Sequence, residues 1–290
     1  MKINSANSSS TSTGHSFSEG SYLDSHYASS QPEYEAMLHS VGLQLGWHVL
    51  DAGCGSGSFH PLMSQLLGSQ GHIEALDLAP ENVDVVRSRS DAGQLECPLT
   101  ASVGPVTKLP YQDNQFDAVW CSAVTQYLTD AELKQTLAEF YRVVRPGGLV
   151  AVKDWDHPSF VLSIPGARVL YRLYEAMING GDVKFVQMFR DTELPAWLRN
   201  AGLIDVKGKT HLVERYQPLP NATIDFLKTV LPVYSERAKV FGVSEADLAI
   251  WEKVNQVDGP NSVLNDPDFY FREGHMMATG YVPEMIDEEV

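Results

Sequence analysis

The stretch VLDAGCGSGSF, residues 49–59, decides the fold. An apolar run leads into Asp51, and glycine then stands at every second position, at Gly53, Gly55 and Gly57. Because glycine has no Cβ, such a loop turns sharply and lets its backbone approach a ligand, and the next helix presents free amide groups to it. The same glycines also suit a plain tight turn between a strand and a helix. The stretch therefore predicts a strand, a loop and a helix start, with a ligand site as the functional interpretation.

Apolar segments of strand length alternate with helical patterns around this loop. A helical pattern over residues 32–45 precedes it. Apolar strands joined by single helices of crossover length are typical of a parallel sheet covered on both faces. We therefore predict an α/β fold, with a Rossmann-like, doubly wound sheet of seven strands, mostly parallel, an antiparallel last strand, and a helical cap insertion. Strands are expected within 48–53, 71–78, 96–103, 116–122 and 149–154, and helices within 59–68, 80–93 and 129–144.

The segments outside this alternation divide the chain. Residues 1–18 lack the apolar core of a secretory signal, and we expect a disordered tail there. Residues 19–290 are expected to form one domain, whose cofactor-binding core spans 45–155. The segments 156–200 and 217–265 are expected to add cap elements over a substrate, and this helical cap would also permit a homo-oligomer contact.

Composition narrows the class of protein. The formal net charge is −16, which opposes attraction to nucleic acid phosphates or anionic lipids, so we expect neither a nucleic-acid partner nor membrane insertion. The three cysteines, Cys54, Cys97 and Cys121, are widely spaced and suggest neither a disulfide framework nor a zinc site. A reducing, cytoplasmic setting and no metal are the resulting expectations.

The spacing of the glycines separates two kinds of nucleotide site. A dinucleotide fingerprint places glycine at the first, third and sixth positions, whereas the sixth position here is Ser58. Asp77 ends the second expected strand, where a carboxylate can accept hydrogen bonds from ribose hydroxyls. Asp77 suits NAD and S-adenosylmethionine equally. An NAD-type dehydrogenase is therefore a disfavoured alternative, and a non-catalytic S-adenosylmethionine-binding protein is the other alternative.

Four motifs together carry a family resemblance. VLDAGCGSGSF, IEALDLAPENV, LPYQDNQFDAVWCSAVTQYL and EFYRVVRPGGLVAVKD closely resemble the class I S-adenosylmethionine-dependent methyltransferases, especially the ubiquinone-biosynthesis-type small-molecule branch. The resemblance covers about residues 45–155. It implies that Asp51, Gly53, Gly55 and Gly57 surround the methionine and ribose of S-adenosylmethionine, and that Asp77 holds the ribose hydroxyls.

One position departs from the family pattern. Where the family commonly has an acid for the adenine amino group, this chain has Pro105. The resemblance then leaves adenine to backbone groups near Val106 and to apolar packing from Leu78. Cys121 and Ser122 match family positions that face the methionine end of the cofactor, although Cys121 also suits a buried core position.

The catalytic residues are expected beside the same sheet edge. Methyl transfer needs the acceptor about 3 Å from the methyl group and a proton acceptor for a neutral nucleophile. The stretch VKDWDHPSF supplies Asp154 and His157, of which His157 has a pKa near neutrality and suits a general base. Upstream, SYLDSHYASS offers Tyr22, His26 and Tyr27, either as an arm that folds over the cofactor or as a frayed terminus.

The substrate is expected to be a small, hydrophobic metabolite that accepts the methyl group on oxygen, nitrogen or carbon. Aromatic residues and methionines are frequent in the expected cap elements, although such residues are more often ordinary core. They include Phe160, Tyr174, Met177, Phe185 and Met188. Three arginines of the same segments suit an anionic group of the acceptor, although a surface role is commoner for such residues: Arg168, Arg172 and Arg190.

Overall fold

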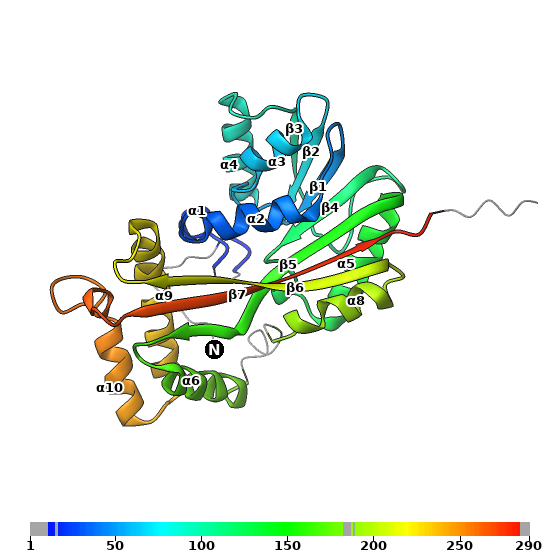
Figure 1. The fold of residues 1–290 in the computed structure, drawn as a ribbon. Coiled ribbons are helices and arrows are strands. Elements are labelled where there is room, and N and C mark those ends of the chain that lie inside the picture. Colours follow the sequence, from blue (N-terminus) through cyan, green and yellow to red (C-terminus); the bar gives the residue numbers. More distant parts are fainter. Residues whose placement is uncertain (1–10, 15–16, 182–186, 188, 285–290) are drawn as a thin grey trace, which may run out of the picture.

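One seven-stranded sheet runs through the protein (Figure 1). The computed structural model describes residues 11–14, 17–181, 187 and 189–284. The strand order is β3-β2-β1-β4-β5-β7-β6, and β7 runs antiparallel to both of its neighbours while the other pairs are parallel. The predicted doubly wound sheet with an antiparallel last strand is confirmed. The strands are β1 (His48–Ala52), β2 (His72–Asp77), β3 (Leu99–Val103), β4 (Phe116–Ser122), β5 (Val144–Leu162), β6 (Ile204–Tyr216) and β7 (Tyr270–Tyr281).

Helices cover both faces of the sheet. On one face α2, α3 and α4 pack against β1, β2 and β3, and on the other α5 and α8 pack against β4, β5 and β7. Ser244 caps the start of the last helix, since its side chain accepts a hydrogen bond from the amide of Asp247. The helices are α1 (Gly20–Ser29), α2 (Gln31–Val41), α3 (His60–Leu67), α4 (Pro80–Asp91), α5 (Asp130–Val143), α6 (Ala167–Asn179), α8 (Leu194–Asn200), α9 (Asn221–Val240) and α10 (Glu245–Val254), with short 3-10 turns η1 (Thr125–Tyr127), η2 (Asp191–Glu193) and η3 (Val263–Asn265).

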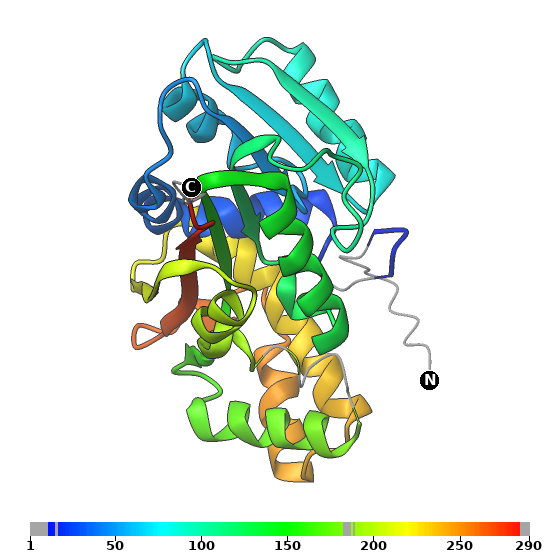
Figure 2. The same cartoon turned by 90° about the vertical axis from the view of Figure 1, so that its right-hand side faces the viewer.

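A second apolar core lies at one end of the sheet. β5, β6 and β7 extend past the shorter strands, and α6, α9 and α10 gather against this extension, far from α3 and α4 (Figures 1 and 2). Phe160 and Phe271 on the strands pack with Phe226 of α9 and Trp251 of α10 in one buried cluster. The segment 217–265 therefore contributes α9 and α10 to a core built on the extended strands. Within the described residues, no helix has the length and apolarity to cross a bilayer.

The N-terminal segment lies against the domain. α1 packs on α9, and Phe17 ahead of it is buried with its ring 4.8 Å from that of Tyr22. Residues 11–14 and 17–18 belong to the stretch expected to be a disordered tail, yet Thr11 is buried and the amide of Ser12 donates to Glu81. These contacts place the described part of that stretch beside α4. Residues 1–10 and 15–16 lie outside the described residues, as do Phe185 and Met188 of the expected cap.

Candidate functional site

The glycine loop leaves β1 at Ala52 and passes beside the end of β4. Gly53, Gly55 and Gly57 have φ angles of 82°, 54° and 75°, a region that favours glycine. A Cβ on Gly53 would lie 2.2 Å from Val124 Cγ2, and one on Gly57 would lie 2.5 Å from His60 Nδ1. Gly53 is thus needed for contact with the segment after β4, and Gly57 for the packing of α3.

A carboxylate at the end of β2 holds this loop. Asp77 accepts hydrogen bonds of 2.8 Å from the amides of Gly55 and Ala79, and one of 3.3 Å from Asn82 Nδ2. Burial raises the pKa of Asp77, and these hydrogen bonds only partly offset it. Since a carboxylate has about four acceptor sites, Asp77 retains capacity for a ligand hydroxyl.

A cavity of about 280 Å³ opens between the glycine loop, α1, the end of β4 and the middle of β5. Its walls include Tyr34, Phe59, Trp155, Gly104 and Pro105. It brings together eight of the twelve residues that we expected in the site: Tyr22, Asp51, Gly53, Gly55, Asp77, Leu78, Val106 and Ser122. Gly57, Cys121, Asp154 and His157 do not line it.

The stretch VKDWDHPSF lies within a strand rather than in the loop after one. β5 continues to Leu162 because β7 pairs with residues 149–156 and, after a register shift, with Val161 and Leu162. Because side chains alternate along a strand, Asp154 lies on the face of β5 opposite to Lys153, which lines the cavity. There Asp154 accepts hydrogen bonds from Thr125 Oγ1 (2.5 Å) and the amide of Gln126 (2.9 Å). Its observed contacts hold η1 in place.

The other expected residues outside the cavity lining are buried. His157 is 1% exposed, and its Nδ1 lies 3.3 Å from the carbonyl oxygen of Trp155. Cys121 is fully buried in the core between the sheet and α5, where burial raises the pKa of its thiol. Neither side chain meets a ligand in the cavity without a rearrangement.

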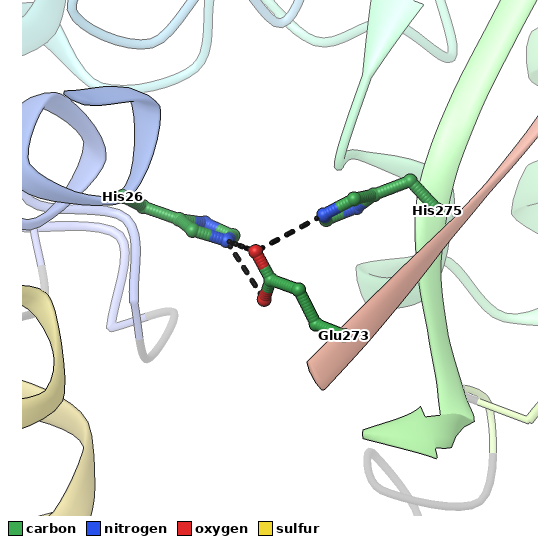
Figure 3. A group of neighbouring side chains, drawn as sticks. All are labelled: His26, Glu273 and His275. Carbon is green, nitrogen blue, oxygen red and sulfur yellow. Dashed lines mark hydrogen bonds and ion pairs between the residues drawn. The ribbon is translucent and has the colours of Figure 1, made fainter. Parts of the chain in front are cut away.

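A buried polar network reaches the cavity from β7. It consists of His26 on α1 and of Glu273 and His275 on β7 (Figure 3). His26 Nε2 lies 3.0 and 3.1 Å from the two carboxylate oxygens of Glu273, and His275 Nε2 lies 3.2 Å from Oε1. Ser30 Oγ donates a further hydrogen bond of 2.8 Å to Glu273. We call His26, Glu273 and His275 the β7 network.

The charges of the β7 network follow from its burial. Burial alone would raise the pKa of Glu273, but the interactions with His26 and His275 outweigh it and hold this pKa well below its usual value. Burial, followed by the charge of Lys153, lowers the pKa of His275 to about 3. At neutral pH the network thus contains an ionised Glu273 and a neutral His275. The ring of His26 stacks on Phe226 at 4.5 Å and is a wall of the cavity.

Comparison with known proteins assigns this architecture to a family. Residues 50–152 match the family model described as "Methyltransferase domain". The chain is 33% identical over 184 residues to the Ubiquinone biosynthesis O-methyltransferase of Xylella fastidiosa (strain 9a5c), which covers 61% of this chain and 67% of that protein. The chain belongs to the class I S-adenosylmethionine-dependent methyltransferases, in the ubiquinone-type branch. This methyltransferase is also 31% identical over 132 residues to the Demethylmenaquinone methyltransferase of Listeria welshimeri, covering 46% of this chain and 53% of that one.

Solved structures share the fold of this methyltransferase. A putative methyltransferase from Bacillus halodurans aligns with a TM-score of 0.52 at 15% identity, covering 86% of this chain and 97% of that one. Phosphoethanolamine N-methyltransferase 2 of Haemonchus contortus, solved with S-adenosyl-L-methionine, gives 0.51 at 15% identity and covers 88% and 53%. The family assignment leaves no support for the dehydrogenase alternative.

The cavity fits the cofactor of this methyltransferase family. The glycine loop, Leu78 and Val106 all line it, and Asp77 retains acceptor capacity that would suit a ribose hydroxyl. Leu78 is 48% exposed, so an apolar surface remains there for a planar base. S-adenosylmethionine supplies a methyl group on a sulfonium sulfur when bound.

Among the described residues, two groups of side chains have donor atoms close enough together for a metal ion. The atoms of the β7 network lie within 4.8 Å of one another, and so do those of His48, His72 and Glu74 at the opposite end of the sheet. Glu273 of the β7 network already accepts hydrogen bonds, and Lys153 is close enough to shift the pKa of His275. An ammonium group here opposes a divalent cation.

Three residues of this site were not among the candidates in the sequence. They are Lys153, Glu273 and His275. The signal for two of them is the alternation in REGHMM, which puts Glu273 and His275 on one face of a strand that is otherwise apolar. Lys153 stands in a similar apolar strand, where a charged residue is rare unless it has a partner.

Proposed function

We propose that this methyltransferase transfers the methyl group to a hydroxyl oxygen of a small, largely apolar ring compound. The cavity walls favour such an acceptor, because Tyr22, Tyr27, Tyr34, Phe59 and Trp155 contribute aromatic rings to them. The names of the two relatives point to quinone-related rings as the first class to test. In this proposal the residues that bind the cofactor are Asp51, Gly53, Gly55, Asp77, Leu78, Val106 and Ser122.

The observation that carries the proposal is the pairing of His26 with Glu273. Because the ionised Glu273 accepts from Nε2 of His26, this nitrogen carries a hydrogen and Nδ1 has the free lone pair. Tyr34 Oη also lies 3.1 Å from Nε2, whereas no hydrogen bond to Nδ1 occurs among the described residues, and His26 lines the cavity that the glycine loop also lines. We propose that Nδ1 takes the hydroxyl proton of the acceptor while Glu273 stabilises the imidazolium.

The other polar groups have supporting roles in this proposal. Tyr22 lines the cavity and is 4% exposed, and burial raises its pKa well above the ordinary value, so its hydroxyl remains protonated and able to donate. Asp154 positions η1, which carries Gln126 and Tyr127 into the cavity wall. Closure by α1 excludes water from the reacting groups.

The test is methyl transfer to a panel of hydroxylated quinols and catechols. Purified protein is incubated with methyl-labelled S-adenosylmethionine, and the products are extracted and their methylated atom identified by mass spectrometry. We expect an O-methylated product, and His26→Asn is expected to lower kcat by about 100- to 10,000-fold, the range for general-base catalysis. His39→Asn, at an exposed position of α2, is the matched control. Wild-type kcat in the His26→Asn variant would refute the assignment of the base, and exclusive C-methylation would refute the proposed acceptor.

A further inference from the structure

Lys153 is a buried cation beside the cavity. It lies on β5 with its side chain on the face opposite to that of Asp154, and it is 2% exposed. Its Nζ stands 4.0 Å from the centre of the Tyr34 ring, and the residue is part of the cavity wall together with His26 and Trp155. The ammonium thus has an aromatic face on one side and the cavity on another.

Lys153 has no acidic partner within the described part of the chain. Over residues 11–14, 17–181, 187 and 189–284, Nζ makes no hydrogen bond and no ion pair. The two carboxylates that influence it most, Glu273 and Asp154, are already hydrogen-bonded to other groups. Burial lowers the pKa of Lys153 to about 8, against the opposing effect of these carboxylates, so the group remains mostly protonated at neutral pH. A buried, unpaired ammonium is costly, and the cost is offset when an anion enters the cavity.

The sequence suggested three arginines as partners for an anionic group of the acceptor. In the structure, two of them form ion pairs with other residues and the third is exposed. Arg172 forms a two-pronged ion pair with Asp247. Arg190 binds Asp130 and donates to the carbonyl oxygens of Thr125 and Leu128. Arg168 is exposed and is not part of the cavity wall. Among the described residues that line the cavity, Lys153 is therefore the one lysine or arginine that is presented to a ligand.

We propose that Lys153 anchors an anion subsite that takes one anionic oxygen of the methyl acceptor, a phenolate, enolate or carboxylate oxygen. The inference rests on the proposed function and adds to it the charge of the bound acceptor. His26 and Lys153 line the same cavity, so the anion left by proton transfer to His26 is stabilised by Nζ. Lys153 is then a specificity-determining residue, because a neutral ring without an ionisable hydroxyl leaves the ammonium unpaired.

The cofactor also carries a carboxylate, at its methionine end. The placement of Lys153 favours the acceptor, since its Nζ lies 4.0 Å from the centre of the Tyr34 ring and Tyr34 Oη lies 3.1 Å from Nε2 of His26, the proposed base. The experiment must nevertheless separate these two sources of an anionic oxygen.

The first arm measures the ionisation of a bound phenol without turnover. The protein is saturated with S-adenosylhomocysteine and titrated with 4-nitrophenol below the pKa of the free phenol, while the absorbance band of the phenolate is followed. We expect the band to appear with wild-type protein and with Lys134→Met, which removes an exposed lysine of α5. In Lys153→Met the affinity is expected to fall by about 10- to 100-fold, the range for a hydrogen bond to a charged group. Nitrobenzene, which cannot ionise, is expected to lose no affinity in Lys153→Met relative to wild type.

The second arm tests the cofactor. Binding of S-adenosylhomocysteine is compared with that of 5′-methylthioadenosine, which has the nucleoside but no carboxylate. We expect Lys153→Met to leave both affinities within a few-fold of wild type. A selective loss for S-adenosylhomocysteine would overturn the proposal by assigning Lys153 to the cofactor, and an unchanged phenolate band in Lys153→Met would overturn it as well.

Thermal unfolding of Lys153→Met checks that the variant is folded, and Lys153→Arg provides a second, charged variant. We expect Lys153→Arg to retain more phenolate binding than Lys153→Met, and equal loss in both would overturn the role of the charge. Since no arm needs turnover, failure of the proposed methyl transfer would leave these readouts interpretable.

Discussion

Alanine at position 53 would drive a methyl group into the side chain of Val124. A Cβ added to Gly53 would lie 2.2 Å from Val124 Cγ2, and the residue has a φ of 82°. The left-handed backbone costs about 1 to 2 kcal/mol for a residue with a Cβ, and overpacking of this kind costs about 1 to 3 kcal/mol. The reduced entropy of the unfolded chain returns about 0.4 to 1 kcal/mol. Gly53→Ala is therefore expected to lower the free energy of unfolding by about 2 to 4 kcal/mol.

Gly93→Ala is the matched control for this prediction. Gly93 has a φ of 69°, but its added Cβ would meet no atom within 4 Å. Only the backbone cost applies there, and we expect a loss of about 1 kcal/mol. The free energies come from urea unfolding, with the slope compared among variants to verify that the unfolded states match.

Val124→Ala completes a double-mutant cycle with Gly53→Ala. Removing Cγ2 should make Gly53→Ala less costly by about 1 to 3 kcal/mol, because the overpacking part disappears. If Gly53→Ala costs no more than Gly93→Ala, or if the cycle shows no coupling, the close approach of the loop to the segment after β4 is not what requires glycine.

Three further outcomes are expected. Asp77→Ala should weaken binding of S-adenosylhomocysteine by about 10- to 100-fold in calorimetry. The control is Asp24→Ala, which loses hydrogen bonds to Ser56 and Ser58 of the same loop but lies outside the cavity lining, and it should weaken binding much less. Equal losses in the two variants would contradict a direct role of Asp77. Burial raises the pKa of Asp191 to about 7, with a further contribution from the charges of neighbouring carboxylates. Between about pH 4 and 7 the folded state therefore binds more protons than the unfolded state. Since these protons are lost as pH rises, the free energy of unfolding falls through this window. Asp191→Asn should accordingly be more stable than wild type by roughly 1 to 3 kcal/mol at about pH 8, with the difference vanishing near pH 4, and a pH-independent difference in thermal unfolding would argue against the raised pKa. Dialysis against EDTA should leave methyl transfer unchanged, because we interpret the β7 network as hydrogen-bonded; loss of activity that zinc or magnesium restores would show that the network holds a metal.

Local sequence patterns predicted the cofactor half of the fold because each pattern there has a local cause. The strand, glycine loop and helix around Gly53 follow from residues adjacent in the chain, and Thr129 with Glu132 caps α5 as a pair three residues apart. Whether VKDWDHPSF forms a loop or a strand depends instead on its pairing with β7, more than a hundred residues later. Pairing with β7 carried β5 on to Leu162 and turned an expected loop into a buried strand.

The acceptor half of the site could not be read from the sequence for the same reason. The contact between His26 and Glu273 joins α1 to β7 across 247 positions of the chain. Periodicity places each residue on a face of its own element, but it does not say which elements meet. For Lys153, the decisive fact is the absence of an acidic partner in the described residues, which only the packed structure shows.

The most direct measurement is a crystal structure of the protein with S-adenosylhomocysteine and 4-nitrophenol bound together. We expect the ribose hydroxyls at Asp77, the sulfur facing the part of the cavity lined by His26 and Trp155, and the phenolate oxygen within hydrogen-bond distance of Lys153 Nζ. A cofactor bound with its sulfur turned away from His26, or with its own carboxylate on Lys153, would contradict the arrangement proposed for methyl transfer.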